Sequence, residues 1–114
     1  MFDFEKLEVY SRAKAFNKLI SQLIQRHQYD RTTNDQLRRA SFSIMLNIAE
    51  GSGRFTQKDK RNFYIISRGS VYECVAILDY LEDTGQLDKE SYDNFYHNLE
   101  ELSKMLFAMI KGLS

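Results

Sequence analysis

The chain has 114 residues, with no proline, five glycines and one cysteine, and its 16 Lys and Arg balance 16 Asp and Glu. This length predicts one domain, residues 1–114, and the lack of proline favours long helices over a sheet with many turns. A lone cysteine excludes an internal disulfide, and neither a signal-peptide pattern nor a membrane-spanning apolar run is present. We therefore expect a cytoplasmic protein with no membrane role.

The first predicted helix covers residues 5–27, where apolar residues recur at alternating spacings of four and three. Its expected inner face consists of Val9, Ala13, Phe16, Leu19, Ile20, Leu23, Ile24 and His27. Residues 29–33 are polar and predict a connection. Thr33 followed by Gln36 fits a capping box, which places the start of the second helix near residue 34.

The second predicted helix, residues 34–50, is apolar on two sides. One side carries Leu37, Ala40, Ile44, Met45 and Ile48. At 100° per residue, Phe42, Leu46 and Ala49 fall on a roughly opposite arc. A helix that is apolar on two sides is expected to be buried on both. We therefore predict that another copy of the chain covers the arc of Phe42, Leu46 and Ala49.

Two further helices are predicted over residues 57–83 and 89–111, with Thr56 and Asp88 as their N-caps. Their expected inner faces are Phe63, Ile66, Ser70, Cys74, Ile77 and Leu81 in the third helix, and Tyr92, Phe95, Leu99, Leu102, Leu106, Met109 and Leu113 in the fourth. The mid-helix Gly69-Ser70 pair predicts close approach of another helix. Short connections between four helices predict an all-α, left-handed, antiparallel up-down-up-down four-helix bundle.

Polar residues gather where the second helix ends at Gly51 and Gly53. Ser43, Asn47 and Glu50 form a polar arc on the second helix, and Ser70 and Glu73 lie along the third. We predict that Glu73 pairs with Arg38 or Arg39, and that Glu50 contacts the start of the third helix, which favours a carboxylate. A structural role in fixing helix register is favoured over an acid site, because Glu50 and Glu73 are too far apart to converge.

Other catalytic or cofactor chemistry has little support. Asp93, His97, Glu100 and Glu101 share one side of the fourth helix, but a solvated face is favoured over a metal site because no second element supplies ligands. Cys74 has no adjacent histidine and is typical of a core thiol. We expect no enzyme activity, no catalytic residue and no cofactor.

A stripe of alternating basic and aromatic residues on the third helix is the clearest binding signal. Arg61, Tyr64, Arg68 and Tyr72 recur at helical spacing, with Arg54 and Lys58 near the start of the stripe. Arginine beside aromatic rings suits contact with phosphates and stacked bases. The same residue types are enriched in subunit interfaces, so both interpretations stay open.

Several motifs carry a resemblance to a known family. They are Phe4-x-x-Leu7-x-x-Tyr10, the segment from Leu37 to Arg54 that contains Asn47-Ile48-Ala49-Glu50-Gly51, and Gly69-Ser70-x-x-Glu73. Together they resemble the four-helix-bundle proteins encoded in 23S ribosomal RNA intervening sequences, over nearly the whole chain. The resemblance implies a bacterial cytoplasmic bundle with no established enzyme activity. It also implies kinship with accessory proteins of diversity-generating retroelements, which form barrel-shaped pentamers that engage nucleic acid and a reverse transcriptase.

The sequence therefore predicts a non-enzymatic homo-oligomer, a pentamer by resemblance, that binds RNA or DNA or serves a ribonucleoprotein. The alternative is a protein-binding scaffold without a nucleic-acid role. Residues 1–68 hold 13 Lys and Arg against 7 Asp and Glu, whereas residues 69–114 hold 3 against 9. The basic and acidic halves could therefore pair between subunits or with a partner protein. Candidate nucleic-acid contacts are Arg38, Arg39, Arg54, Lys58, Arg61 and Arg68. Candidate subunit contacts are Phe42, Leu46, Ala49, Tyr64 and Tyr72.

Overall fold

Four α-helices and one short 3₁₀ turn account for most of the chain, with no strand. The computed structural model describes residues 1–114, in the order η1 (Asp3–Lys6), α1 (Glu8–His27), α2 (Arg31–Ser52), α3 (Gln57–Asp83) and α4 (Lys89–Gly112). The predicted first helix is therefore divided, with a 3₁₀ turn before α1. None of the helices combines the length and the apolar character needed to cross a bilayer.

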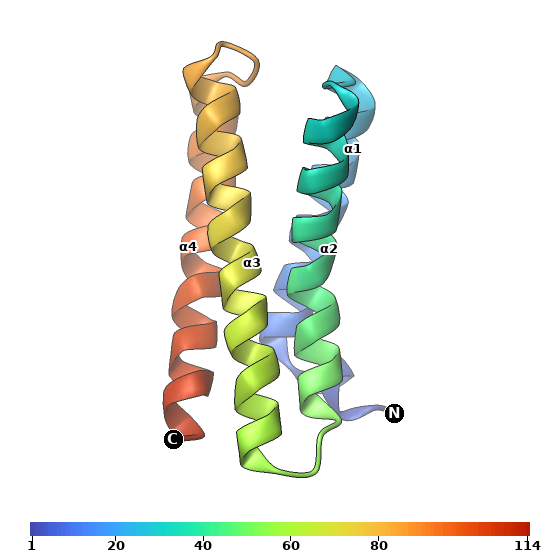
Figure 1. Ribbon diagram of the computed structural model, residues 1–114, viewed down its shortest axis with the longest axis vertical. Coiled ribbons are helices and arrows are strands. Elements are labelled where there is room, and N and C mark those ends of the chain that lie inside the picture. The colour runs from blue at the N-terminus through green and yellow to red at the C-terminus, as the bar shows by residue number, and fades with distance from the viewer.

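The helices form an elongated bundle of 44 × 23 × 21 Å. Each helix packs against two neighbours, α1 with α2 and α4, and α3 with α2 and α4, whereas the diagonal pairs meet only through side chains in the core. Figure 1 shows the turn between α2 and α3 at the lower end, near the C terminus, and the loop between α3 and α4 at the upper end. This arrangement confirms the predicted helical bundle.

Three helices begin at a side-chain cap. The carboxylates of Asp30 and Asp88 accept hydrogen bonds from the backbone N–H groups of Thr33 and Ser91, and the Thr56 hydroxyl accepts from Asp59 N–H. The caps at Thr56 and Asp88 confirm the sequence prediction. The predicted cap at Thr33 is wrong, because Asp30 satisfies the free N–H group of Thr33 and starts α2 at Arg31.

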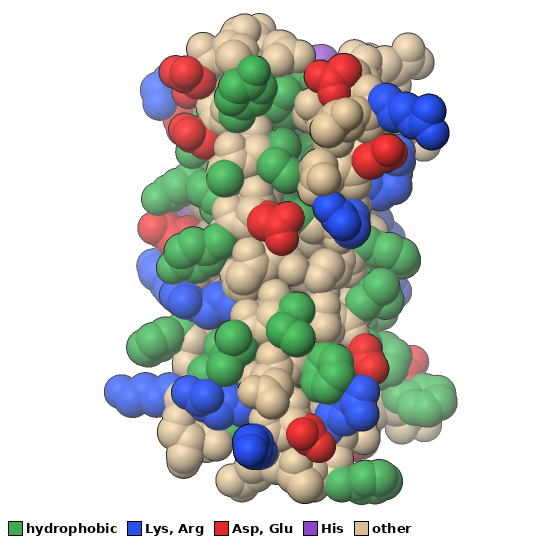
Figure 2. Space-filling model, in the orientation of Figure 1, with side chains coloured by type: hydrophobic (Ala, Val, Ile, Leu, Met, Phe, Trp, Pro, Cys, Tyr) green, Lys and Arg blue, Asp and Glu red, His purple; other side chains and the backbone are tan.

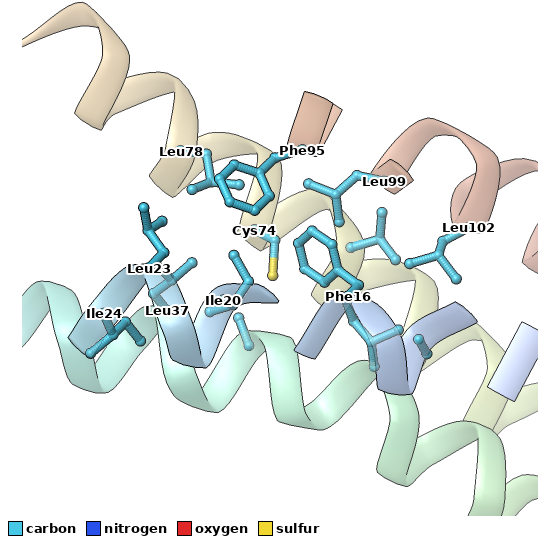
Figure 3. Packing of buried hydrophobic residues seen from close by; sticks show 14 of the residues in the cluster. Phe16, Ile20, Leu23, Ile24, Leu37, Cys74, Leu78, Phe95, Leu99 and Leu102 are labelled. Carbon is cyan, nitrogen blue, oxygen red and sulfur yellow. The ribbon is translucent and has the colours of Figure 1, made fainter. Parts of the chain in front are cut away.

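The core lies along the centre of the bundle and takes side chains from all four helices. Figure 3 shows Cys74 pointing into this cluster beside Phe16 and Ile20, with Phe95 and Leu99 contributed by α4. The buried inner faces are largely those predicted for α1, α2 and α4. Two predicted members at the edge of α1, Leu19 and His27, are exposed.

The inner face of α3 differs from the prediction by a rotation about the helix axis. Ser70, Cys74 and Leu81 are buried as expected, but Ile66 is 51% exposed. The remaining buried positions of α3 are Tyr64, Ser67, Val71 and Leu78, whereas Phe63 and Ile77 are half-buried. The stripe was misplaced because α3 carries apolar residues around much of its circumference, so periodicity alone did not define one face.

Gly51 sits where α2 and α3 come closest at their shared turn. A Cβ atom at Gly51 would lie 2.9 Å from both Phe63 Cβ and Tyr64 Cε1, so only glycine fits here. The close approach predicted at Gly69 is absent within the bundle, because nothing lies within 4 Å of a Cβ built there. The tight helix contact is therefore at the turn and not in the middle of α3.

Candidate nucleic-acid interface

A polar seam runs between α2 and α3. The hydroxyl oxygens of Ser43 and Ser70 lie 2.8 Å apart, and Asn47 Nδ2 donates to both the carbonyl and the hydroxyl of Ser43 at 2.9 Å. Ser67 Oγ, fully buried, donates to the Ile44 carbonyl at 2.8 Å. All of these groups are neutral and mutually satisfied, so the seam fixes how the two helices align and supplies no acid or base.

The two carboxylates predicted to join this seam lie outside it. Glu73 is exposed and makes no ion pair, while Arg38 Nη1 lies 3.9 Å from Asp35 and Arg39 Nη2 donates to Gln36 at 2.6 Å. The predicted pairing of Glu73 with Arg38 or Arg39 is wrong. The rotation of α3 that buries Val71 and Leu78 and exposes Ile66 turns the Glu73 side chain to the surface.

Glu50 is held at the turn between α2 and α3. Its carboxylate accepts a hydrogen bond from Arg54 Nη2 at 2.7 Å, and the same guanidinium lies 4.4 Å from the centre of the Phe63 ring. The predicted contact between Glu50 and the first turn of α3 is therefore replaced by one with Arg54. Lys60 Nζ donates to the Ser52 carbonyl at 2.9 Å, so this free backbone carbonyl at the end of α2 has a hydrogen-bond partner.

A basic groove between α3 and α4 holds the best-placed arginines. The Arg68 guanidinium lies 5.1 Å from the Tyr72 ring centre and 5.4 Å from that of Phe107, and its Nε donates to the Ser103 carbonyl at 3.2 Å. Arg61 lines the same groove, of about 520 Å³, and its buried Nε has no hydrogen-bond partner in the chain. The groove thus presents planar cations beside aromatic rings, which suits phosphates and bases.

Tyr64 does not belong to this outward stripe. It is only 5% exposed, and burial raises the pKa of its phenol above the ordinary value of 10.0. Tyr64 therefore packs in the core beneath Gly51 and is unavailable as a subunit contact of the folded chain. Phe107, which the sequence analysis left out, takes the aromatic place beside Arg68. Its position on one flank of the apolar heptad of α4, directly after Leu106, was the signal that could have identified it.

The other candidate basic residues lie at two separate places. Lys58 is exposed at the start of α3, near Arg54, whereas Arg38 and Arg39 lie in the first half of α2, nearer the opposite end of the bundle. Figure 2 shows Lys and Arg gathered at the lower left, over the start of α3 and the end of α4, and acidic side chains at the upper left. The six candidates thus do not form one continuous surface.

The charges of α3 run against the preference of a helix dipole. Its first twelve positions, residues 57–68, contain Lys58, Lys60, Arg61 and Arg68 with a single acid, and residues 69–83 contain four acids and no base. Cations are favourable at the C-terminal end of a helix and anions at the N-terminal end. The helix dipole therefore does not account for this charge distribution.

A sequence profile of 23S rRNA-intervening sequence proteins matches residues 5–108. The chain belongs to this family. The match runs from η1 through nearly all of α4, so it contains the polar seam, the α2–α3 turn and the basic groove.

The fold of this member of the 23S rRNA-intervening sequence protein family recurs in a solved structure. A protein of unknown function from the S23 ribosomal protein family of Bacteroides thetaiotaomicron superposes with a TM-score of 0.85. The two chains are 24% identical, and the similarity covers 90% of this chain and 98% of the other. At this identity the likeness concerns the fold alone. A comparison with curated proteins found no match.

Residues for metal binding do not converge in this family member. No group of three or more His, Cys, Asp or Glu side chains is placed to hold a metal ion. Asp93, on the side of α4 weighed as a weak metal site, lies 3.4 Å from Lys89 Nζ instead. Burial, assisted by the nearby Glu73 charge, raises the pKa of Cys74 to about 12, so its thiol is protonated and unreactive at neutral pH.

Apolar side chains remain on the outside of the bundle. Phe42 and Leu46 on α2 are each 46% exposed, and Tyr72 on α3 is 58% exposed. Ala49, at the end of the same α2 arc, is half-buried. These residues are the ones expected to contact another copy of the chain, and they are uncovered in the single chain.

Proposed function

We propose that this protein is a non-enzymatic, self-associating RNA-binding accessory factor, built as a left-handed, antiparallel up-down-up-down bundle. The basic groove of Arg61 and Arg68 supplies the RNA contact, extended by Arg54 and Lys58 at the turn end. Membership of a family named for intervening sequences in 23S rRNA supports this assignment. The protein acts in a bacterial cytoplasm as a pentamer, with a reverse transcriptase as its protein partner.

The arrangement around Arg68 carries the proposal. The Arg68 guanidinium lies near two rings and its Nε donates to the Ser103 carbonyl, while its Nη atoms make no hydrogen bond within the chain. Arg61 beside it has a buried Nε that the chain leaves without a partner. A phosphate in the groove would accept hydrogen bonds from the Nη groups of Arg68, and an unstacked base would extend the row of rings.

RNA binding is tested by a gel shift with structured RNA across a salt series. The wild-type chain should show affinity that falls as salt rises, and the double variant Arg61→Glu/Arg68→Glu should bind more weakly, with a log–log slope smaller by about 1 to 2. Lys14→Glu/Lys18→Glu, an equal charge change on the exposed face of α1, is the matched control. Loss of binding in the control, or salt-insensitive binding, contradicts the assignment.

A protein-binding scaffold is the second candidate. The observation that favours it is the contrast between a largely basic first half of the chain and a largely acidic second half, which suits contact between proteins. Affinity purification that recovers one partner after nuclease treatment, with no RNA bound by the pure protein, would support the scaffold over the RNA-binding role.

A further inference from the structure

Phe55, at the tip of the turn between α2 and α3, has no packing partner in the chain. It is fully exposed, more so than any other large apolar residue of the protein. The turn lies at the lower end of the bundle in Figure 1, so the Phe55 ring sits at the end of the molecule and not along its sides. Single apolar residues on a surface are common, and the surroundings of Phe55 therefore have to show whether its ring has a function.

The ring does not fill the structural role that is usual at this position. Phe55 directly precedes Thr56, the N-cap of α3, and an apolar residue there commonly packs on the fourth residue of the helix. In this chain the fourth residue is Lys60, whose Nζ instead donates to the Ser52 carbonyl at 2.9 Å. Because Phe55 is fully exposed, the start of α3 gains no stability from its ring.

The backbone on both sides of Phe55 is fixed by contacts that do not involve its ring. Arg54 is held by the Glu50 carboxylate at 2.7 Å and by the Phe63 ring, whose centre lies 4.4 Å from the guanidinium. On the other side, the Thr56 hydroxyl caps α3. A ring carried on such a turn is already in position before a ligand arrives, so binding orders little additional structure.

The surroundings of Phe55 are basic. Residues 54–61 contain four cations and one acid, which are Arg54, Lys58, Lys60, Arg61 and Asp59. Figure 2 shows Lys and Arg side chains over this start of α3. Cations contact phosphates, and an aromatic ring stacks on a base of any identity. The combination of an exposed ring and flanking cations therefore fits a nucleotide better than an apolar protein surface.

We propose that Phe55 is a base-stacking residue, and that the RNA bound by this protein carries an unpaired base that stacks on the Phe55 ring. Lys58, exposed in the first turn of α3, supplies a cation for an adjacent phosphate. Bases inside a duplex are stacked on each other, whereas loops, bulges and single-stranded ends leave a base free to stack on an aromatic side chain. This inference rests on the proposed function and adds the substrate class, which is RNA with unpaired nucleotides.

Removal of the ring is tested by gel shift on two RNAs with the same number of nucleotides, a stem with an unpaired loop and a blunt-ended duplex. Phe55→Ala should bind the stem-loop about 5- to 150-fold more weakly than the wild type, the loss expected for one stacked base. The salt dependence should not change, because no charge is removed. Binding to the duplex should be unaffected, and Phe55→Tyr should retain the wild-type affinity for both RNAs.

Tyr80→Ala is the matched control, with circular dichroism on every variant. Tyr80 is 62% exposed at the opposite end of α3, where its neighbours in the sequence include the acids Asp79, Glu82 and Asp83. Its removal should therefore leave the affinity for both RNAs unchanged. Because Phe55 and Tyr80 are both exposed, neither substitution is expected to disturb the fold.

Fluorescence provides a second measurement that reports stacking directly. The chain contains no tryptophan, so Phe55→Trp introduces a single indole at the tip of the turn. Stem-loop RNA should quench the emission of this indole on binding, because a base stacks against it, and the duplex should not. Tyr80→Trp, with its indole at the acidic end of α3, should show no quenching by either RNA.

The outcomes separate the role of Phe55 from RNA binding itself. Equal affinity of the wild type and Phe55→Ala for the stem-loop would overturn the stacking role and leave the proposed function standing. An equal loss on the stem-loop and the duplex would also overturn it. So would a lower assembly mass of Phe55→Ala in sedimentation velocity with unchanged RNA affinity, which would identify Phe55 as a subunit contact. A wild-type chain that binds neither RNA would contradict the proposed function and the stacking role together.

Discussion

Ser43 and Ser70 share a hydrogen bond of 2.8 Å between α2 and α3, next to the bond that Ser67 Oγ donates to the Ile44 carbonyl. Ser70 Oγ also lies 3.2 Å from the Ile66 carbonyl, and Asn47 Nδ2 reaches the Ser43 hydroxyl. Each hydroxyl therefore has more than one partner. This arrangement fixes the register of the helices, because a shift of either helix would leave polar groups unpaired.

Removing the hydroxyl pair should reveal its contribution to stability. Ser43→Ala and Ser70→Ala are each expected to lower the free energy of unfolding by about 1 kcal/mol, because a partly buried partner loses a hydrogen bond. The double variant should lose less than the sum of the two, since both substitutions remove one shared interaction. Urea unfolding of the four chains measures this coupling, and strictly additive losses would contradict it.

Gly51 should tolerate no side chain. Alanine there would place Cβ 2.9 Å from Phe63 Cβ and Tyr64 Cε1, and relief requires α2 and α3 to separate. Overpacking costs about 1–3 kcal/mol, which outweighs the gain in helix propensity of up to ~1 kcal/mol. Gly53→Ala is the matched control, because its nearest neighbour is the Glu50 carbonyl oxygen at 3.6 Å. Thermal unfolding should show a lower Tm for Gly51→Ala only.

Gly69→Ala should have the opposite effect on the single chain. The residue lies in the middle of α3, and nothing is within 4 Å of a Cβ built at this position. Alanine should therefore stabilise the bundle by about 0.5–1 kcal/mol through its higher helix propensity. Denaturant unfolding under dissociating conditions provides the measurement. A loss of stability there would mean that the space beside Gly69 is needed within the bundle.

Cys74 should be unreactive until the chain unfolds. Its pKa is raised to about 12 from 9.0 because the thiol is buried, with Glu73 adding to the shift. At pH 8 the folded thiol is therefore protonated and shielded, whereas the unfolded thiol titrates near its ordinary value. Iodoacetamide at pH 8 should modify the protein in urea and leave it unmodified in buffer. Rapid modification of the folded chain would contradict the burial of Cys74.

The caps of α2 and α4 should make stability depend on acid pH. Hydrogen bonds from Thr33 lower the pKa of Asp30 below 3.8, and hydrogen bonds from Ser91 lower that of Asp88. A lowered folded pKa gives stability that is present above 3.8 and is lost as pH falls through the folded value. The Tm should therefore fall below pH 4. Asp30→Asn/Asp88→Asn should reduce this dependence, because the amide caps the helix without titrating.

Local chemistry in the sequence determined much of this protein. The apolar period of 3.6 residues predicted where the helices lie. Thr56 and Asp88 marked the starts of α3 and α4, because a cap satisfies N–H groups only a few residues away. The same apolar period predicted that Cys74 lies in the core, because this residue falls within an apolar stripe. The outward arc of Phe42 and Leu46 likewise followed from angular spacing along a single helix.

The tertiary structure alone decided which face of α3 points inward. Apolar residues surround much of α3, so its rotation depends on the shapes of α2 and α4 against it, and packing chose Tyr64, Val71 and Leu78. That rotation moved Glu73 to the surface and took Tyr64 out of the basic stripe. It also brought Phe107 of α4 beside Arg68. These two residues are distant in the sequence, and only the packing of α3 against α4 brings them together.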